Sequence, residues 1–279
     1  MRHRRSNALA GHRASQLGVL ALALAALPVA TWAGGTVDSS LEAFLAADFS
    51  TQPSEDITNP WWTLPAGSNF LYFAESDGEC EWNLVEVLPL VTDNFGGDYA
   101  GTDARVVLDR EWEDEECTYE TFADVVANIA PGETTYDWYA QDLAQNIWYM
   151  GENTMSGGGS TGGSFTAGCG GAQAGIVILG SPQKGDSYQQ EYFPGEAEDQ
   201  GKVLNFLDAD GLVCMKTKEW NPISPGDVEH KFYCSDGETG DLVLIEELKG
   251  KTKIVELIER NIVAPPPPVG PPFPAPADC

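Results

Sequence analysis

The chain has 279 residues, of which 43 are acidic and 15 are basic, so its formal net charge is −28. A surface of this sign repels nucleic acid and anionic membranes, and the composition therefore excludes nucleic-acid binding as the main activity. Of its 3 histidines only His230 lies beyond residue 12, which excludes a multi-histidine metal centre in the rest of the chain.

The first 33 residues have the order of a secretory signal peptide. Four arginines and no acidic residue lie within them, an apolar stretch covers 17–30, and small residues flank Trp32 up to Ala33. That stretch is too short to span a bilayer comfortably, and no other stretch is apolar and long enough. We therefore expect cleavage near Ala33, a secreted or periplasmic location, no transmembrane segment and a mature net charge near −32.

A short N-terminal helix is predicted after Ser39. Ser39 and Glu42 have the spacing of a capping box, and Leu41, Phe44 and Leu45 share one helical face.

Beyond Pro60 the chain is predicted to form strand after strand. The segments are rich in Val, Ile, Tyr, Phe, Trp and Thr, and turn pairs such as Asp77-Gly78 and Asp210-Gly211 separate them. Short connections favour an all-β, mainly antiparallel fold, either a curved sheet or a β-barrel meander. The expected strands cover residues 68–76, 81–92, 103–111, 117–128, 134–141, 146–151, 186–193, 200–208, 212–220, 227–235, 241–248 and 251–262.

Composition divides the chain into six segments. We expect a signal peptide at 1–33, an N-terminal segment with the short helix at 34–60, a first β half at 61–155, a glycine-rich loop at 156–171, a second β half at 172–263 and a proline-rich tail at 264–279. The tail is expected to be extended and to stay outside the fold.

The 6 cysteines of an exported chain are expected to form disulfides. Residues 212–220 and 227–235 are predicted to form a hairpin, and if Trp220 faces Val228, Cys214 faces Cys234. Cys80 with Cys117 is the second expected pair, whereas Cys169 and Cys279 stay unassigned.

Aromatic side chains are the first set of candidate ligand-binding residues. Neighbouring residues of a strand point to opposite faces, so Trp138 and Tyr139 are expected on different sides of the sheet. One face would line a groove or interior for a small ligand, although aromatic rings also fill barrel cores. The candidates are Trp138, Tyr139, Trp148, Tyr149, Tyr192 and Trp220.

Charged side chains are the second set. Paired carboxylates such as Glu191 and Glu229 suit general acid–base chemistry, and clustered carboxylates suit calcium, a hard cation that takes oxygen ligands. Lys218 and Glu229 are expected to pair across the hairpin, and a plain solvated surface remains the alternative for the whole set. The candidates are Asp137, Glu152, Glu191, Glu198, Asp199, Lys218, Glu229 and Lys231.

Several strings resemble a family of exported bacterial proteins of unassigned activity. They are ITNP at 57–60, DWYAQD at 137–142, NIWYMGE at 146–152, AQAGIV at 172–177, GDSYQQEY at 185–192, GEAED at 195–199, KTKEW at 216–220 and VEHKFY at 228–233. The chain is more distantly similar to half-barrel carriers of the LolA type. The resemblance implies an exported β fold and no particular reaction, and it departs from the family pattern at 165–168, where FTAG replaces a glutamate-containing string.

The sequence thus predicts a secreted or periplasmic, non-enzymatic binding protein for a small apolar molecule or an envelope component. An extracellular hydrolase that uses paired carboxylates and a calcium-stabilised structural envelope protein are the alternatives. No cofactor is expected, apart from the calcium that clustered carboxylates would hold.

Overall fold

The computed structural model describes residues 34–50, 56–156, 159–160, 163–209, 211–250 and 252–267, which all belong to one structural unit. The expected signal peptide and Cys279 lie outside the described residues. Among the residues in these ranges, no helix has the length and apolar character needed to cross a membrane.

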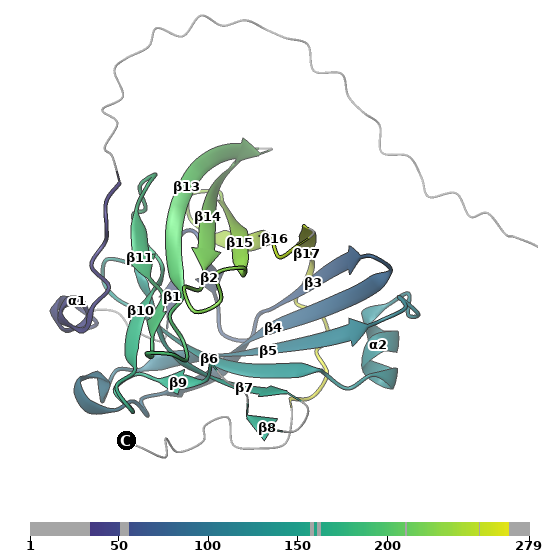
Figure 1. Cartoon of the computed structure of the whole chain (residues 1–279), viewed down its shortest axis with the longest axis horizontal. Helices are drawn as coiled ribbons and strands as arrows, with labels where there is room; N and C mark the ends of the chain where they lie inside the picture. Colours follow the sequence, from purple (N-terminus) through teal and green to yellow (C-terminus); the bar gives the residue numbers. More distant parts are fainter. Residues whose placement is uncertain are drawn as a thin grey trace, which may run out of the picture. The chain divides into compact units, whose positions relative to one another are not determined.

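Two runs of consecutive antiparallel strands make up most of the fold (Figure 1). The first run contains β3 (Asn69–Ser76), β4 (Glu79–Thr92), β5 (Ala104–Asp114), β6 (Glu133–Gln141) and β7 (Ile147–Ser156). The second contains β13 (Gln200–Ala209), β14 (Leu212–Trp220), β15 (Val228–Ser235), β16 (Gly240–Glu247) and β17 (Lys253–Arg260).

The two runs join at both sides, so the sheet nearly closes into a barrel. On one side β17 pairs with β3, with Val255 opposite Ala74. On the other side β7 is followed by β10 (Gln173–Ile178) and β12 (Glu191–Tyr192), while β11 (Ser187–Gln189) pairs with β13. Only Gln190 separates β11 from β12, and its backbone N–H donates to the Asp199 carbonyl at 2.8 Å. The all-β, mainly antiparallel prediction is confirmed, although β10 is absent from the predicted strands.

Residues 57–64 cover one end of the barrel. This plug contains β1 (Ile57–Thr58) and β2 (Thr63–Leu64), which pair with each other. Buried Asn59 holds its turn, because its side-chain oxygen accepts from the backbone of Trp61 at 2.8 Å and its amide donates to the Gln145 carbonyl at 2.6 Å. The plug also contacts the opposite wall, where the Gly240 N–H donates to the Thr63 hydroxyl at 3.2 Å.

The short N-terminal helix is confirmed, but a different residue caps it. Helix α1 (Leu41–Ala46) has Ser40 as its N-cap, and the Ser40 side chain accepts from the Ala43 N–H at 3.3 Å. The Ser39 hydroxyl instead accepts from the Gln189 N–H at 3.0 Å, which ties the N-terminal segment to β11. Phe44 is buried, whereas Leu45 is mostly exposed.

The strand predicted at 117–128 is wrong, because residues 122–128 form a helix. Thr121 caps α2 (Phe122–Asn128) by accepting from the Asp124 N–H at 3.2 Å. Phe122 and Val125 are three residues apart, so both reach the barrel wall from one helical face. The segment is rich in apolar and β-branched residues, a composition typical of strands. Only the helical spacing and the Thr121 cap indicate a helix.

Three minor elements lie in the connections. The 3-10 turn η1 covers Gly97–Tyr99, while the two-residue strands β8 (Gly159–Ser160) and β9 (Phe165–Thr166) both pair with β7. The predicted glycine-rich loop therefore includes backbone that adds to the barrel wall.

The start of the proline-rich tail packs on the outer barrel wall, where the sequence predicts a segment outside the fold. The Asn69 amide donates to the Ile262 carbonyl at 3.0 Å and its oxygen accepts from the Ile262 N–H at 2.8 Å. The buried Arg110 guanidinium donates to the carbonyls of Pro265 at 2.9 Å and Pro266 at 3.1 Å. These polar contacts fix residues 261–267 across the outer faces of β3 to β5.

Both predicted disulfides are confirmed. Cys214 is opposite Cys234 and Trp220 is opposite Val228, as the hairpin register requires, and the two cysteine Cα atoms are 3.9 Å apart. Cys80 and Cys117 form the second bond, with Cα atoms 4.9 Å apart.

Replacing both Cys214 and Cys234 by serine is expected to lower the free energy of unfolding by about 3 kcal/mol, because the bond restricts the unfolded chain. The same double replacement at Cys80 and Cys117 should cost about 0.5 kcal/mol more, since 37 rather than 20 residues separate the partners. Urea unfolding of the two variants measures both costs. Unchanged stability of either variant would show that its bond does not constrain the unfolded chain.

Candidate functional site

A cavity of about 160 Å³ lies inside the barrel. Its lining comes from strands on both sides of the sheet (β3, β4, β5 and β6 from the first run, β14, β15 and β16 from the second) and from the plug. Since these strands surround it, the cavity is the lumen of the barrel.

Aromatic rings form the plugged end of the lumen. The centroid of the Trp62 ring is 5.2 Å from that of Tyr139 and 6.1 Å from that of Tyr233. The Tyr72 ring lines the same cavity, and its hydroxyl donates to the Leu242 carbonyl at 2.9 Å. The base of the cavity is therefore a group of ring faces and edges.

Three carboxyl groups line the lumen: Asp109 and Asp137 on one wall, and Glu219 beside Lys231 on the opposite wall. Asp109 accepts a hydrogen bond from the Asn83 amide, and within the described residues neither aspartate makes a salt bridge. Burial raises the pKa of Asp109 to about 6. Burial and then the repulsion of Glu152 raise the pKa of Asp137 well above its usual range. With a pKa of about 6, Asp109 is mostly ionised at neutral pH.

A β-bulge in β7 brings Tyr149 and Glu152 to the same side of the wall. Tyr149 is opposite Tyr139 and Glu152 is opposite Asp137, so the strand gains one residue between them. Gly151 permits this because its φ is 142° and a side chain there would meet the Phe165 carbonyl oxygen at 2.4 Å. Alternation with a period of two would have put Tyr149 and Glu152 on opposite faces.

The Tyr149 hydroxyl bridges the two carboxyl groups. Its oxygen is 2.5 Å from Asp137 Oδ1 and 2.7 Å from Glu152 Oε2. One hydroxyl hydrogen serves only one of these contacts, so the other needs a proton on a carboxyl group. This agrees with the raised pKa of Asp137 and with that of Glu152, which burial raises to about 7.

Lys231 lies on the opposite wall and is held by its own acidic partners. Its Nζ is 2.8 Å from Glu219 Oε2 and 3.5 Å from Glu229 Oε2. Burial acts to lower the Lys231 pKa, but the attraction of Glu219 and Glu229 outweighs it and the pKa is raised. The lysine charge is thus neutralised locally.

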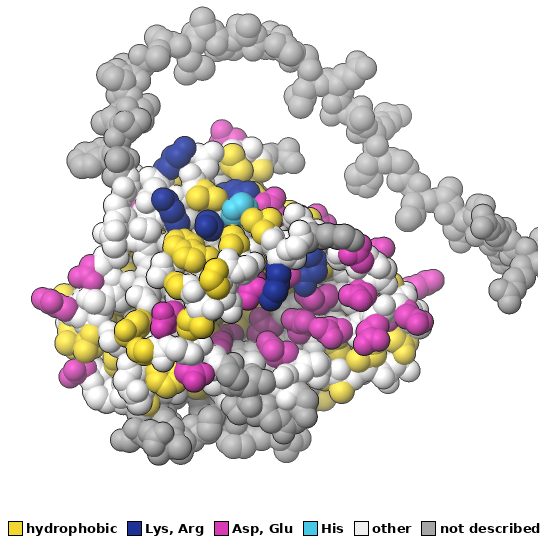
Figure 2. Space-filling view, viewed as in Figure 1, with side chains coloured by type: hydrophobic (Ala, Val, Ile, Leu, Met, Phe, Trp, Pro, Cys, Tyr) yellow, Lys and Arg dark blue, Asp and Glu magenta, His cyan; other side chains and the backbone are white. Residues whose placement is uncertain are grey.

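Acidic side chains surround the end of the barrel that the plug leaves uncovered. Glu81 and Glu247 pair with Lys253 at 2.6 and 3.0 Å. Burial and then the neighbouring Glu81 raise the pKa of Glu111 to about 8. Figure 2 shows a field of Asp and Glu side chains on the right of the view, where Figure 1 places the turn between β3 and β4 and the end of β5. A cation approaching this end meets a negative potential.

The aromatic candidates divide among three places. Tyr139 lines the lumen, and Tyr149 stacks on it with ring centroids 5.0 Å apart. Trp138 packs against Phe95 outside the barrel, as the alternation predicts, and Trp148 donates to Asp142 at 2.9 Å among the outer aromatic residues. Tyr192 and Trp220 line a separate groove on the outside of the barrel.

The charged candidates also divide. Asp137 and Glu152 meet at the Tyr149 hydroxyl, while burial and then Asp199 raise the pKa of Glu191 to about 9. Glu198 accepts from the Gly195 N–H at 2.9 Å and therefore supports a turn.

The expected pair of Lys218 with Glu229 is wrong. Glu219, not Lys218, is opposite Glu229, so Lys218 points to the other face of β14. Its Nζ lies over the Trp220 ring, 4.9 Å from the centroid.

Sequence reasoning missed Asp109, Asn83, Trp62 and Tyr233 in the lumen. A signal for Asp109 exists in β5, where three acidic residues, Asp109, Glu111 and Glu113, occupy every second position. Such alternation puts the charged side chains on one face of the strand. When the other face is buried, this pattern indicates that the charged face lines a polar interior. Trp62 gives no comparable signal because its place depends on the fold of the plug.

In the part of the chain that the structure describes, no group of three or more His, Cys, Asp or Glu side chains has an arrangement that would hold a metal ion. Comparison with known proteins finds no family model, no curated protein and no solved structure that matches this chain. A function for the chain therefore has to be inferred from the geometry of the barrel itself.

Proposed function

We propose that this chain is an exported, non-enzymatic binding protein whose barrel takes a small organic cation. The observation that carries the proposal is the lumen, where Asp109 and Asp137 face a cavity with the rings of Trp62, Tyr139 and Tyr233 around it. A carboxylate beside aromatic rings suits a protonated amine, because both the charge and the negative ring faces attract a cation.

The size of the cavity limits the ligand. At about 160 Å³ it resembles the engineered protein cavities of about 150 Å³ that hold benzene, and it is smaller than the sites of drug-sized ligands. A single aromatic ring or short aliphatic body with one amino group fits this volume.

The lining favours a cation over the wholly apolar molecule that the sequence suggests. Val85, Val107, Val177 and Ile245 provide an apolar wall, but an apolar ligand would leave the buried Asp109 carboxylate with the Asn83 amide and without a salt-bridge partner among the described residues. An ammonium group supplies that partner, while its hydrocarbon body contacts the valines and the rings. The resemblance to half-barrel carriers supports the binding role and says nothing about the ligand.

Asp137, Tyr149 and Glu152 favour a hydrolase as the second candidate. Two carboxyl groups with raised pKa values that share one hydroxyl are able to donate and accept protons near neutral pH. The sequence-based pair of Glu191 and Glu229 is not brought together in this way, since Glu229 is held by Lys231.

Benzylamine is expected to bind and to stabilise the protein, whereas benzyl alcohol, its neutral counterpart, is expected to do so much less. A ligand present at a concentration of about a hundred times its dissociation constant adds about 2.7 kcal/mol to the free energy of unfolding. This corresponds to a rise of about 5–10 °C in melting temperature. Affinity should fall as the pH drops below about 6, because Asp109 is then protonated while the amine stays charged.

Asp109→Asn is the matched variant, since it keeps the shape of the side chain and removes its charge. It should abolish the preference for benzylamine over benzyl alcohol in thermal melts and calorimetry at pH 7.5. Equal stabilisation by both compounds in the wild-type protein would contradict the proposal. Turnover of a chromogenic glycoside that Glu152→Gln abolishes would instead support the hydrolase.

Export is tested separately by N-terminal sequencing of material secreted by the native host. The signal-peptide pattern predicts that the mature protein begins at Gly34. An intact Met1 on exported protein would contradict it.

A further inference from the structure

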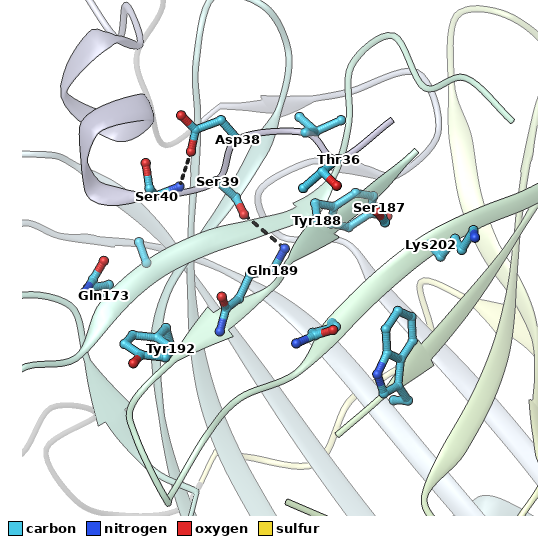
Figure 3. A pocket seen from close by; sticks show the side chains of 14 residues that line it. Thr36, Asp38, Ser39, Ser40, Gln173, Ser187, Tyr188, Gln189, Tyr192 and Lys202 are labelled. Carbon is cyan, nitrogen blue, oxygen red and sulfur yellow. Dashed lines mark hydrogen bonds between the residues drawn. The ribbon is translucent and has the colours of Figure 1, made fainter. Parts of the chain in front are cut away.

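A second and larger cavity lies on the outside of the barrel, where the sheet closes. It has a volume of about 580 Å³, which is within the range of ligand sites. The extended N-terminal segment 36–40 forms one side, and residues of β10, β11, β12, β13 and β14 line the rest (Figure 3). Residues 36–40 are held there by backbone hydrogen bonds, including the Val37 N–H to the Ser187 carbonyl at 2.8 Å.

Three glutamine side chains extend along this groove at positions that the register aligns. Gln189 is opposite Gln200, and Gln200 is in turn opposite Trp220 on the next strand. Gln173 is opposite Tyr192 on the other side of the closure. Because directly opposite residues share a face, each aromatic ring has a glutamine beside it.

The three glutamine side-chain amides are free to hydrogen-bond a ligand as far as the described residues are concerned. The side chains of Gln173, Gln189 and Gln200 make no hydrogen bond to another described residue, although each carries two donor hydrogens and an acceptor oxygen. Tyr192 and Trp220 are both half-buried, so part of each ring is open to the groove. Hydroxyl groups of Thr36 and Ser187 add further polar contacts.

We propose that this groove binds a neutral saccharide chain. Sugar rings present C–H faces that pack on aromatic rings and rims of hydroxyl groups that both donate to and accept from amides. An apolar ligand would bury the amides without partners, and the two charged side chains of the lining, Asp38 and Lys202, have opposite signs, so the groove favours a neutral ligand. The proposal is independent of the amine site, because the groove shares no lining residue with the lumen.

Native electrophoresis through gels containing soluble neutral polysaccharides (xylan, hydroxyethyl cellulose, dextran or glycol chitin) tests the proposal. The wild-type protein should be retarded by at least one of them, and Trp220→Ala and Tyr192→Ala should each weaken that binding about tenfold through loss of ring contact. Phe232→Ala is the matched control, since Phe232 is a half-buried ring on β15 that does not line the groove. It should keep wild-type retardation.

Gln200→Ala removes an amide without removing a ring and should also weaken retardation. Thermal melts establish that each variant is folded before its mobility is compared. Asp109→Asn, which alters only the lumen, should leave retardation unchanged, so failure of the amine site does not affect this test. Absence of retardation in all four gels, or equal retardation of folded Trp220→Ala and wild type, would overturn the proposal.

Discussion

The free energy of unfolding is expected to be greatest near pH 4 and to fall steadily as the pH rises to about 9. This is the reverse of ordinary acid denaturation, in which paired carboxylates lose their partners as they are protonated. The cause is the set of enclosed carboxyl groups whose pKa values burial raises, to about 6 at Asp109, 7 at Glu152, 8 at Glu111 and 9 at Glu191.

The sign follows from proton binding. In the unfolded chain these groups titrate near pH 4, so between about pH 4 and pH 9 the folded protein holds more protons than the unfolded one. Stability is therefore fully present below the unfolded pKa values and is lost as the pH rises through the folded ones. Below about pH 4 Glu246 acts in the opposite direction, because its hydrogen bond from Lys216 lowers its pKa.

Urea unfolding at closely spaced pH values between 4.5 and about 9 measures the profile. Glu152→Gln and Glu191→Gln should flatten it, since each removes a group that would otherwise have to ionise inside the barrel. Glu198→Gln is the control, because the Glu198 carboxylate accepts a hydrogen bond from the Gly195 N–H at an exposed turn. A wild-type profile that rises from about pH 5 to about pH 8 would show that these enclosed carboxyl groups ionise freely.

Arg110→Ala is expected to lower the free energy of unfolding by about 3–5 kcal/mol, the range for removing one member of a buried ion pair. The Arg110 guanidinium is buried and pairs with Glu86, whose pKa burial raises, so the variant leaves an enclosed carboxyl group unpaired. It also removes both hydrogen bonds to the carbonyls of Pro265 and Pro266. Asn261, Ile262, Val263 and Ala264, which carry amide hydrogens directly before the prolines, should therefore exchange those hydrogens much faster.

Arg260→Ala provides the comparison for Arg110. Arg260 is half exposed and pairs with Asp241 at 2.6 Å, so its removal should cost less than about 1 kcal/mol. A combined Arg110→Met and Glu86→Leu variant should recover most of the loss, since no charge then stays buried. If Arg110→Ala lowers the free energy of unfolding no more than Arg260→Ala does, the contacts between Arg110 and the proline-rich segment do not stabilise the barrel wall.

Local patterns were enough to predict most of the barrel strands, though not β10, and the register at Cys214 and Cys234, because turn residues bound the strands and opposite positions have a constant index sum. They failed at residues 122–128, where apolar content resembles a strand and only the Phe122–Val125 spacing and the Thr121 cap indicate a helix. They also failed at Ser39, whose hydroxyl serves a strand 150 residues away instead of the helix.

The candidate site was only partly predictable for a related reason. Alternation placed Tyr139 and Trp138 correctly on opposite faces, but the bulge at Gly151 joins Tyr149, Glu152 and Asp137 in a way that a period of two forbids. Trp62 reaches the lumen only through the turn of the plug that Asn59 holds. The position of a side chain that depends on a bulge or on the plug is determined by the whole fold and cannot be predicted from local sequence patterns.

A crystal structure of the protein grown with benzylamine tests the central proposal most directly. The proposal predicts one molecule in the lumen, with its ring among Trp62, Tyr139 and Tyr233 and its ammonium group within hydrogen-bond distance of Asp109. A lumen that holds no benzylamine at a saturating concentration, or benzylamine bound only in the outer groove, would contradict it.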